Sequence, residues 1–139
     1  MKRLATLLSL LSILALVLLG CSANTSSSSG YGSGSGFSLN ITTSNSSVPE
    51  GGNTTLIVTA KDGQGNPVND SVTGVVFSST LGGTFNPASP FLSSGVTSTV
   101  YTASGGSPTP TPTATVGVTQ ITASYKGAFA YMSIYIFKP

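Results

Sequence analysis

The sequence contains no histidine, no tryptophan and only one cysteine, and 6% of its 139 residues are charged. Enzymes usually act through a nucleophile with a base, paired carboxylates or a metal cluster, and histidine and cysteine supply many of these groups. The only acidic side chains here are Glu50, Asp62 and Asp70. We therefore predict a protein that is not an enzyme, with no catalytic residue, no cofactor and no metal site.

The carboxylate of Asp62 has two alternative interpretations. It stands beside the turn segment 63–68, GQGNPV, in which Gly63 and Gly65 can adopt positive φ. An aspartate at such a place commonly accepts hydrogen bonds from backbone N–H groups, which is the role we expect. The alternative is a calcium site, for which Asp62, Asp70 and loop carbonyls would have to converge without an Asp-rich loop of known ligand spacing.

The sequence also lacks a large net charge of either sign. Its formal net charge is +2, and Lys2 and Arg3 account for it, because the other lysines and the carboxylates balance. Binding to nucleic acid or to an acidic membrane surface requires a basic face, which scattered lysines do not form. We predict that the body of the protein binds neither of them.

Residues 1–20 have the order of a bacterial export signal. Lys2 and Arg3 precede an apolar run over residues 4–19, and the small Gly20 follows. The run is short for a membrane-spanning segment, and no basic cluster comes after it. We therefore expect a signal helix that is cleaved.

The tetrapeptide at residues 18–21, Leu-Leu-Gly-Cys, resembles the bacterial lipobox. The resemblance implies cleavage between Gly20 and Cys21 and attachment of a diacylglycerol, with acyl chains such as palmitate, to the thiol of Cys21. A disulfide or a buried thiol is the alternative, but the chain has no second cysteine. We predict a cell-envelope lipoprotein that meets the membrane through this N-terminal anchor. In enterobacterial lipoproteins, a residue other than Asp after the cysteine usually means sorting to the outer membrane. By that resemblance Ser22 favours the outer membrane, with the domain in the periplasm or on the cell surface.

The predicted linker covers residues 21–36, which consist of the lipid-bearing cysteine followed by SANTSSSSGYGSGSG. A Ser/Gly segment of this length has little to bury and behaves as a disordered coil that spans roughly 20 Å. It would hold the folded part just clear of the lipid headgroups.

Residues 37–139 form the predicted single folded domain, and apolar side chains recur in it with a period of two. That period is typical of half-buried strands, whereas helical periodicity is absent. Disorder of the whole chain is the alternative for so Ser- and Gly-rich a sequence, but the alternating runs argue against it. The inward sets of the first three strands are Phe37, Leu39 and Ile41; Leu56, Val58 and Ala60; and Val75 with Phe77. Further β-rich runs occupy residues 96–103, 114–125 and 128–137.

These runs predict an all-β domain, an antiparallel two-sheet β-sandwich of about seven strands. Each sheet can bury its apolar face only against the other. Lys126 and Gly127 are predicted to form the hairpin turn between the last two runs.

Residues 47–87, SVPEGGNTTLIVTAKDGQGNPVNDSVTGVVFSSTLGGTFNP, are similar to bacterial immunoglobulin-like domains of group 1, the invasin and intimin type. The matching pieces are residues 48–51, Asp62 with 65–68, Val75 with Phe77 and Ser78, and 82–84. Residues 116–127 resemble the family's penultimate strand, and the resemblance covers about residues 37–139. It implies an immunoglobulin-like sandwich with a structural or adhesive role outside the cytoplasm.

The chain departs from that family in two ways. Family members often form tandem arrays on an outer-membrane barrel and end in a receptor-binding domain, whereas this chain has one copy behind a lipobox-like sequence. Residues 105–115, GGSPTPTPTAT, also lengthen a loop with alternating prolines, which favour polyproline II.

The last predicted strand has two different apolar faces. Ala128, Ala130, Met132, Ile134 and Ile136 form the face that we assign to the core. Phe129, Tyr131, Tyr135 and Phe137 form the other, a candidate contact site for a protein or glycan partner provided that it is exposed. The alternative is that long loops or the first strand cover these rings.

Two functions are consistent with these features. The first is a non-catalytic structural or interaction module, including adhesion, at the cell surface. The second is an assembly subunit whose edge strand pairs with a partner chain. The sequence does not predict the oligomeric state.

Overall fold

A computed structural model describes residues 28–30, 36–104 and 116–139, with side chains for all of these except residues 28–30. The predicted signal helix, Gly20, Cys21, most of the linker and the Thr-Pro segment 105–115 lie outside the described residues. Within the described part every regular element is a strand, and no helix there is long and apolar enough to cross a membrane.

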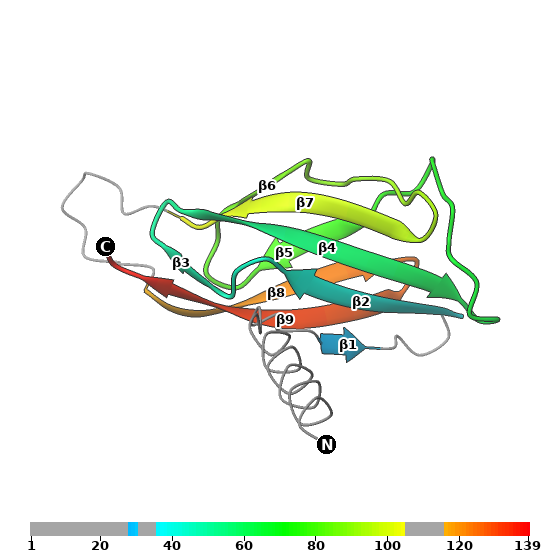
Figure 1. Cartoon of the computed structure of the whole chain (residues 1–139), viewed down its shortest axis with the longest axis horizontal. Helices are drawn as coiled ribbons and strands as arrows, with labels where there is room; N and C mark the ends of the chain where they lie inside the picture. Colours follow the sequence, from blue (N-terminus) through cyan, green and yellow to red (C-terminus); the bar gives the residue numbers. More distant parts are fainter. Residues whose placement is uncertain (1–27, 31–35, 105–115) are drawn as a thin grey trace, which may run out of the picture.

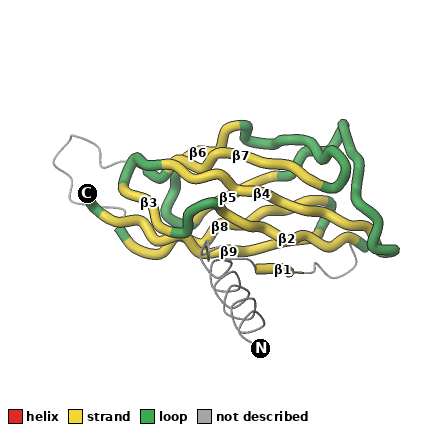
Figure 2. Tube along the Cα trace, in the orientation of Figure 1, coloured by secondary structure: helices red, strands yellow, loops and turns green. Residues whose placement is uncertain are grey.

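The described strands form two sheets that face each other in a sandwich-like arrangement (Figures 1 and 2). The first sheet has the order β1 (Ser28–Gly30), β2 (Phe37–Thr43), β4 (Asn53–Asp62), β7 (Val96–Thr102) and β6 (Thr84–Asn86). The second has the order β3 (Ser47–Pro49), β9 (Ala128–Phe137), β8 (Gly117–Tyr125) and β5 (Val76–Ser79). The prediction of an all-β, two-sheet domain is confirmed.

The core lies between the two sheets and is built from the inward positions of each strand. Side chains alternate between buried and exposed along β4 and along all of β9, as the period of two predicts. Of the predicted inward sets, Phe37 is only partly buried, and the others are buried. The largest fully buried side chains include Tyr101, Leu39, Ile41, Leu56, Ile121 and Ile134.

The prediction that all pairing is antiparallel is wrong at one place. Most neighbouring strands are antiparallel, but β3 pairs with β9 in parallel, with Ser47 opposite Tyr135. Only residues 44–46 separate β2 from β3, so the chain changes sheets without reversing its direction. Both β2 and β9 run toward the same end of the molecule (Figure 1).

The described residues form nine strands rather than the predicted number of about seven. The short strands β1, β3 and β6 have three residues each, too few for an alternating pattern to be recognised. The segment Ser28–Gly30 falls within the linker for which we expected a coil, and it pairs with β2. The edge of β2 offers unpaired backbone N–H and C=O groups. Backbone pairing of this kind does not require particular side chains, so a Ser/Gly segment can form it.

Both predicted turns are present. Lys126 (φ 43°) and Gly127 (φ 82°) join β8 to β9, and two successive positive φ values are typical of a type I′ hairpin. The hairpin prediction is therefore confirmed. In the turn at residues 63–68, Gly65 uses the positive φ that glycine allows and Gly63 does not; a hydrogen bond from the N–H of Gly65 to the carbonyl of Asp62 closes this turn.

Candidate functional site

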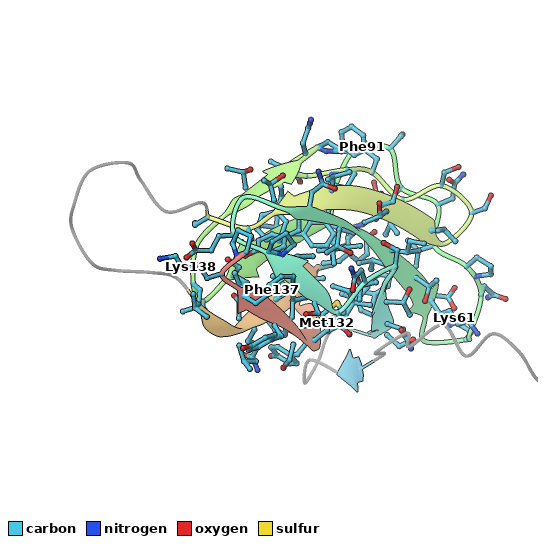
Figure 3. All side chains as sticks on the ribbon, turned by 60° about the vertical axis from the view of Figure 1, so that its left-hand side comes forward. Lys61, Phe91, Met132, Phe137 and Lys138 are labelled. Atoms are coloured by element: carbon cyan, nitrogen blue, oxygen red, sulfur yellow. The ribbon has the colours of Figure 1, made fainter. Side chains whose placement is uncertain are left out.

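The candidate site is the outer side of β9, where four aromatic side chains are partly exposed. Phe129, Tyr131, Tyr135 and Phe137 keep 39, 41, 49 and 36% of their surface accessible. Their neighbours along the strand point inward and are buried (Figure 3, in which Met132 and Phe137 are labelled). The exposure that a contact site requires is therefore present.

Aromatic exposure is concentrated on this one strand. Among the described residues, the only other exposed aromatic side chain is Phe91, which lies in a loop. On the outer side of the first sheet the exposed large apolar side chains are aliphatic: Ile57, Val96 and Val100. The two outer surfaces of the domain thus differ in chemistry.

We call the outward-facing residues of β5, β8 and β9 the aromatic face. On β8, the residues opposite the rings are Val118 beside Tyr135, Thr122 beside Tyr131 and Ser124 beside Phe129. The complete set is Val76, Ser78, Val118, Gln120, Thr122, Ser124, Phe129, Tyr131, Ser133, Tyr135 and Phe137. None of these side chains is charged, so the face offers rings, hydroxyl groups and one amide.

The rings of Phe129 and Tyr131 are nearly parallel. Their centroids are 6.5 Å apart and their planes differ by 12°. Residues two apart on a strand are separated by about 6.6–6.8 Å, so the backbone itself sets this spacing. Ser133 follows, and Tyr135 and Phe137 stand further along β9 with the same two-residue spacing in the sequence.

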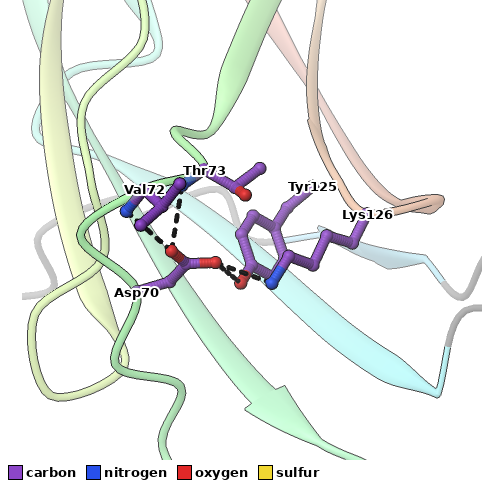
Figure 4. A network of polar contacts seen from close by, with 5 residues as sticks. All are labelled: Asp70, Val72, Thr73, Tyr125 and Lys126. Carbon is purple, nitrogen blue, oxygen red and sulfur yellow. Dashed lines mark hydrogen bonds and ion pairs between the residues drawn. The ribbon is translucent and has the colours of Figure 1, made fainter.

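The most highly connected carboxylate belongs to Asp70, in the loop between β4 and β5 (Figure 4). Its Oδ2 lies 2.7 Å from the Nζ of Lys126 and accepts a hydrogen bond of 2.7 Å from the hydroxyl of Tyr125. Its Oδ1 accepts hydrogen bonds from the backbone N–H groups of Val72 and Thr73 at 2.8 and 2.9 Å. These contacts lower the pKa of Asp70, and the contact with Lys126 makes the largest contribution.

The other members of this cluster respond to the same contacts. The hydrogen bond to Asp70 raises the pKa of Lys126, and burial, together with the bond to Asp70, raises the pKa of Tyr125. The ammonium of Lys126 also lies 5.2 Å from the ring centroid of Tyr125 and 5.8 Å from that of Phe37. The cluster ties the loop to the β8–β9 hairpin, which is a structural role.

Asp62 has the structural role expected for it. Its Oδ1 accepts hydrogen bonds from the backbone N–H groups of Gln64 and Asn66 at 2.9 and 2.8 Å, and its Oδ2 accepts one from the side-chain amide of Asn66. The bond from the backbone of Asn66 is the main cause of its lowered pKa. In the described part of the chain, no group of three His, Cys, Asp or Glu side chains is placed to hold a metal ion.

The chain was compared with protein families and with curated protein sequences. No protein-family model matches the chain, and no curated protein sequence matches it.

Proposed function

We propose that the protein is a non-catalytic lipoprotein of the cell envelope that presents one immunoglobulin-like domain as an interaction module. The observation that carries the proposal is the row of four exposed aromatic side chains on an uncharged sheet face. Contiguous exposed apolar surface is typical of interaction sites, and aromatic residues are enriched in such sites. The aromatic face is therefore proposed as the contact surface for another component of the envelope, such as a protein or a glycan.

The immunoglobulin-like identity is supported by the sequence resemblance to the invasin and intimin family and by the two-sheet arrangement, in which one matching motif, residues 82–84, has a packing role. Gly82 (φ 76°) and Gly83 (φ 106°) precede β6. This backbone brings the carbonyl of Gly82 within 2.8 Å of the hydroxyl of Tyr101, which donates a hydrogen bond to it from the core. The motif thus has a packing role that suits a two-sheet domain.

The test uses a soluble chain of residues 22–139, with and without Tyr131→Ala and Tyr135→Ala. The double variant should bind isolated cell envelopes at least about tenfold more weakly in a co-sedimentation assay, since two central rings are removed. Its circular dichroism spectrum and Tm should remain close to those of the parent chain. Ile57→Ala removes an exposed side chain from the opposite sheet and serves as the matched control. Equal binding by all three chains would exclude the aromatic face as the contact surface.

A second candidate function is assembly by edge-strand pairing. On the side of β9 away from β8, β3 pairs only with the end of the strand: Ser47 lies opposite Tyr135, Val48 opposite Ile136 and Pro49 opposite Phe137. Along residues 128–134, no described strand pairs with β9 on that side. β1 lies beside β9 without forming a ladder with it. Size-exclusion chromatography with cross-linking of residues 22–139 tests this candidate, and a monomer at every concentration would count against self-assembly.

A further inference from the structure

The aromatic face lies close to the part of the chain that leads to Cys21. β1 pairs with β2 and lies beside β9 (Figure 1). The ring of Phe37, at the start of β2, lies 5.4 Å from the ring of Tyr125, at the end of β8. β2 and β9 therefore begin at the same end of the molecule. The first described residue, Ser28, thus lies near the strand that carries the four exposed rings.

The chain between Cys21 and Ser28 is short. It consists of residues 22–27, and a fully extended chain spans about 3.3–3.6 Å per residue, so the two Cα atoms lie within about 25 Å of each other. The ten-residue strand β9 is itself about 33 Å long. Pairing of β1 with β2 therefore leaves a much shorter tether than residues 22–36 would provide. A bilayer that holds acyl chains on Cys21 must lie near the side of the domain formed by β1 and β9.

The chemistry of the aromatic face suits a membrane surface. Tyrosine is enriched at the membrane–water interface, where an apolar ring and a polar tip are both accommodated, and phenylalanine adds apolar area. In the strand register, Gln120 and Ser133 lie between Tyr131 and Tyr135, and Thr122 lies opposite Tyr131. The amide and the two hydroxyl groups can bond to headgroup and ester oxygens. Because the face carries no charge, its contact with lipid needs no anionic headgroup.

We propose that the aromatic face rests on the surface of the same bilayer that holds the acyl chains of Cys21. The proposal depends on the lipid attachment in the proposed function and names the membrane as the partner of this face. The domain then lies along the membrane on its second sheet, with the outer side of the first sheet directed into the aqueous phase. A second copy of the chain, a surface protein and a glycan are the other occupants that the experiment must separate.

The experiment places a nitroxide spin label on one of two matched serines in the full, lipidated chain. Ser133→Cys puts the label in the centre of the aromatic face, and Ser98→Cys puts it at an exposed position on the outer side of the first sheet. The proteins are reconstituted into phosphatidylcholine vesicles, and flotation with the vesicles is measured first. The accessibility of each label to a water-soluble nickel complex and to oxygen is then measured by electron paramagnetic resonance.

We expect both variants to float, the label at position 133 to be several-fold less accessible to nickel than the label at 98, and its accessibility to oxygen to rise. Adding Phe129→Ser and Tyr135→Ser should restore nickel access at 133. Neither salt nor added phosphatidylglycerol should change the result, because the face is uncharged.

The remaining outcomes each overturn the proposal in a distinguishable way. Equal nickel access at both positions in floating protein would mean that the face points away from lipid, while the anchor and the interaction module would stand. If the label at position 133 is protected from nickel before the protein is reconstituted into vesicles, and this protection depends on protein concentration, a second copy of the chain is the occupant. Failure to float would reject the lipid anchor itself.

Discussion

Asp70 connects two parts of the chain through a single carboxylate. Two of its contacts are with backbone N–H groups in its own loop, and two are with side chains of the β8–β9 hairpin, 55 residues away in the case of Tyr125. The side chain of Asp70 is only 11% exposed, whereas that of Lys126 is 43% exposed. Removing the negative charge therefore abolishes the ion pair with the ammonium of Lys126 and weakens the hydrogen bond donated by the hydroxyl of Tyr125.

The lowered pKa of Asp70 predicts a dependence of stability on acid. The folded state holds this proton less tightly than the unfolded state, whose pKa is near the ordinary value of 3.8. The contribution of Asp70 to stability is present above that value and is lost as the pH falls below it toward the folded-state pKa. The Tm of the wild-type domain should therefore decline between about pH 5 and pH 2.

Asp70→Asn should lower the Tm at pH 7 and reduce the decline in acid, as measured by thermal unfolding across that pH range. Asp62→Asn is the comparison variant: Asp62 also has a lowered pKa but contacts only its own turn, so its replacement should reduce the acid decline less than Asp70→Asn does. Parallel Tm curves for wild type and Asp70→Asn would show that the cluster contributes no pH-dependent stability.

Gly83 is required by space as well as by backbone conformation. A Cβ atom there would lie 2.5 Å from the carbonyl oxygen of Thr102 and 2.6 Å from the ring of Tyr101, at φ 106°. Gly65→Ala provides a control, since Gly65 has φ 85° and nothing within 4 Å of the same atom. Positive φ alone should cost about 1–3 kcal/mol in both variants. Gly83→Ala should lose a further ~1–3 kcal/mol through overpacking, measured by urea unfolding. Equal losses would contradict the steric argument.

At the scale of the element, β9 combines two functions on its two sides. Its inward residues lie in the centre of the core, and its outward residues form most of the aromatic face. The same ten residues thus hold the second sheet to the first and present the proposed contact surface. Because the two sets alternate strictly, substitutions can separate stability from binding.

Ile134→Ala and Tyr135→Ala test that separation at neighbouring positions. Ile134 is fully buried, so its truncation should cost about 2–5 kcal/mol through lost apolar contact and the cavity left behind. Tyr135 is 49% exposed, and its truncation should cost about 1 kcal/mol or less. Both losses in the free energy of unfolding are measured by denaturant unfolding, from the shift in the midpoint at an unchanged slope m. A larger loss for Tyr135→Ala would mean that its ring is a core residue in solution.

For the whole molecule, the proposed position at the membrane depends on the N-terminal anchor. Each methylene buried in lipid contributes about 0.8 kcal/mol, so the acyl chains expected on Cys21 would hold the domain permanently, whereas the aromatic face would orient it. The anchor and the face thus have separate roles, and each can be removed alone.

Cys21→Ser should shift the protein from the membrane fraction to the soluble fraction or leave it with an uncleaved N-terminus. The wild-type protein should show, by mass spectrometry of the intact chain, cleavage after Gly20 and the added mass of the lipid. Ser22→Ala, which keeps the cysteine, should remain lipidated and membrane-bound. A native protein with an unmodified thiol at Cys21 would reject the lipoprotein assignment.

The sequence alone determined which residues of the long strands are inside and where two of these strands turn. Alternation is a local property of a pleated chain, so Leu39, Ile41, Leu56 and Ile134 could be placed in the core before any partner strand was known. The Lys126-Gly127 turn is equally local. The resemblance to an immunoglobulin-like family and the lipid anchor remain proposals.

Tertiary structure decided the features that depend on distant parts of the chain. Three-residue strands such as β1 and β3 carry no period, because they form only where a neighbouring edge offers backbone partners. The sequence does not predict the contact of Asp70 with the β8–β9 hairpin, because the two segments meet only in the folded chain. Alternation placed the four rings of β9 on one side, but whether they stayed exposed depended on what packed over that side, and only the folded arrangement supplied this.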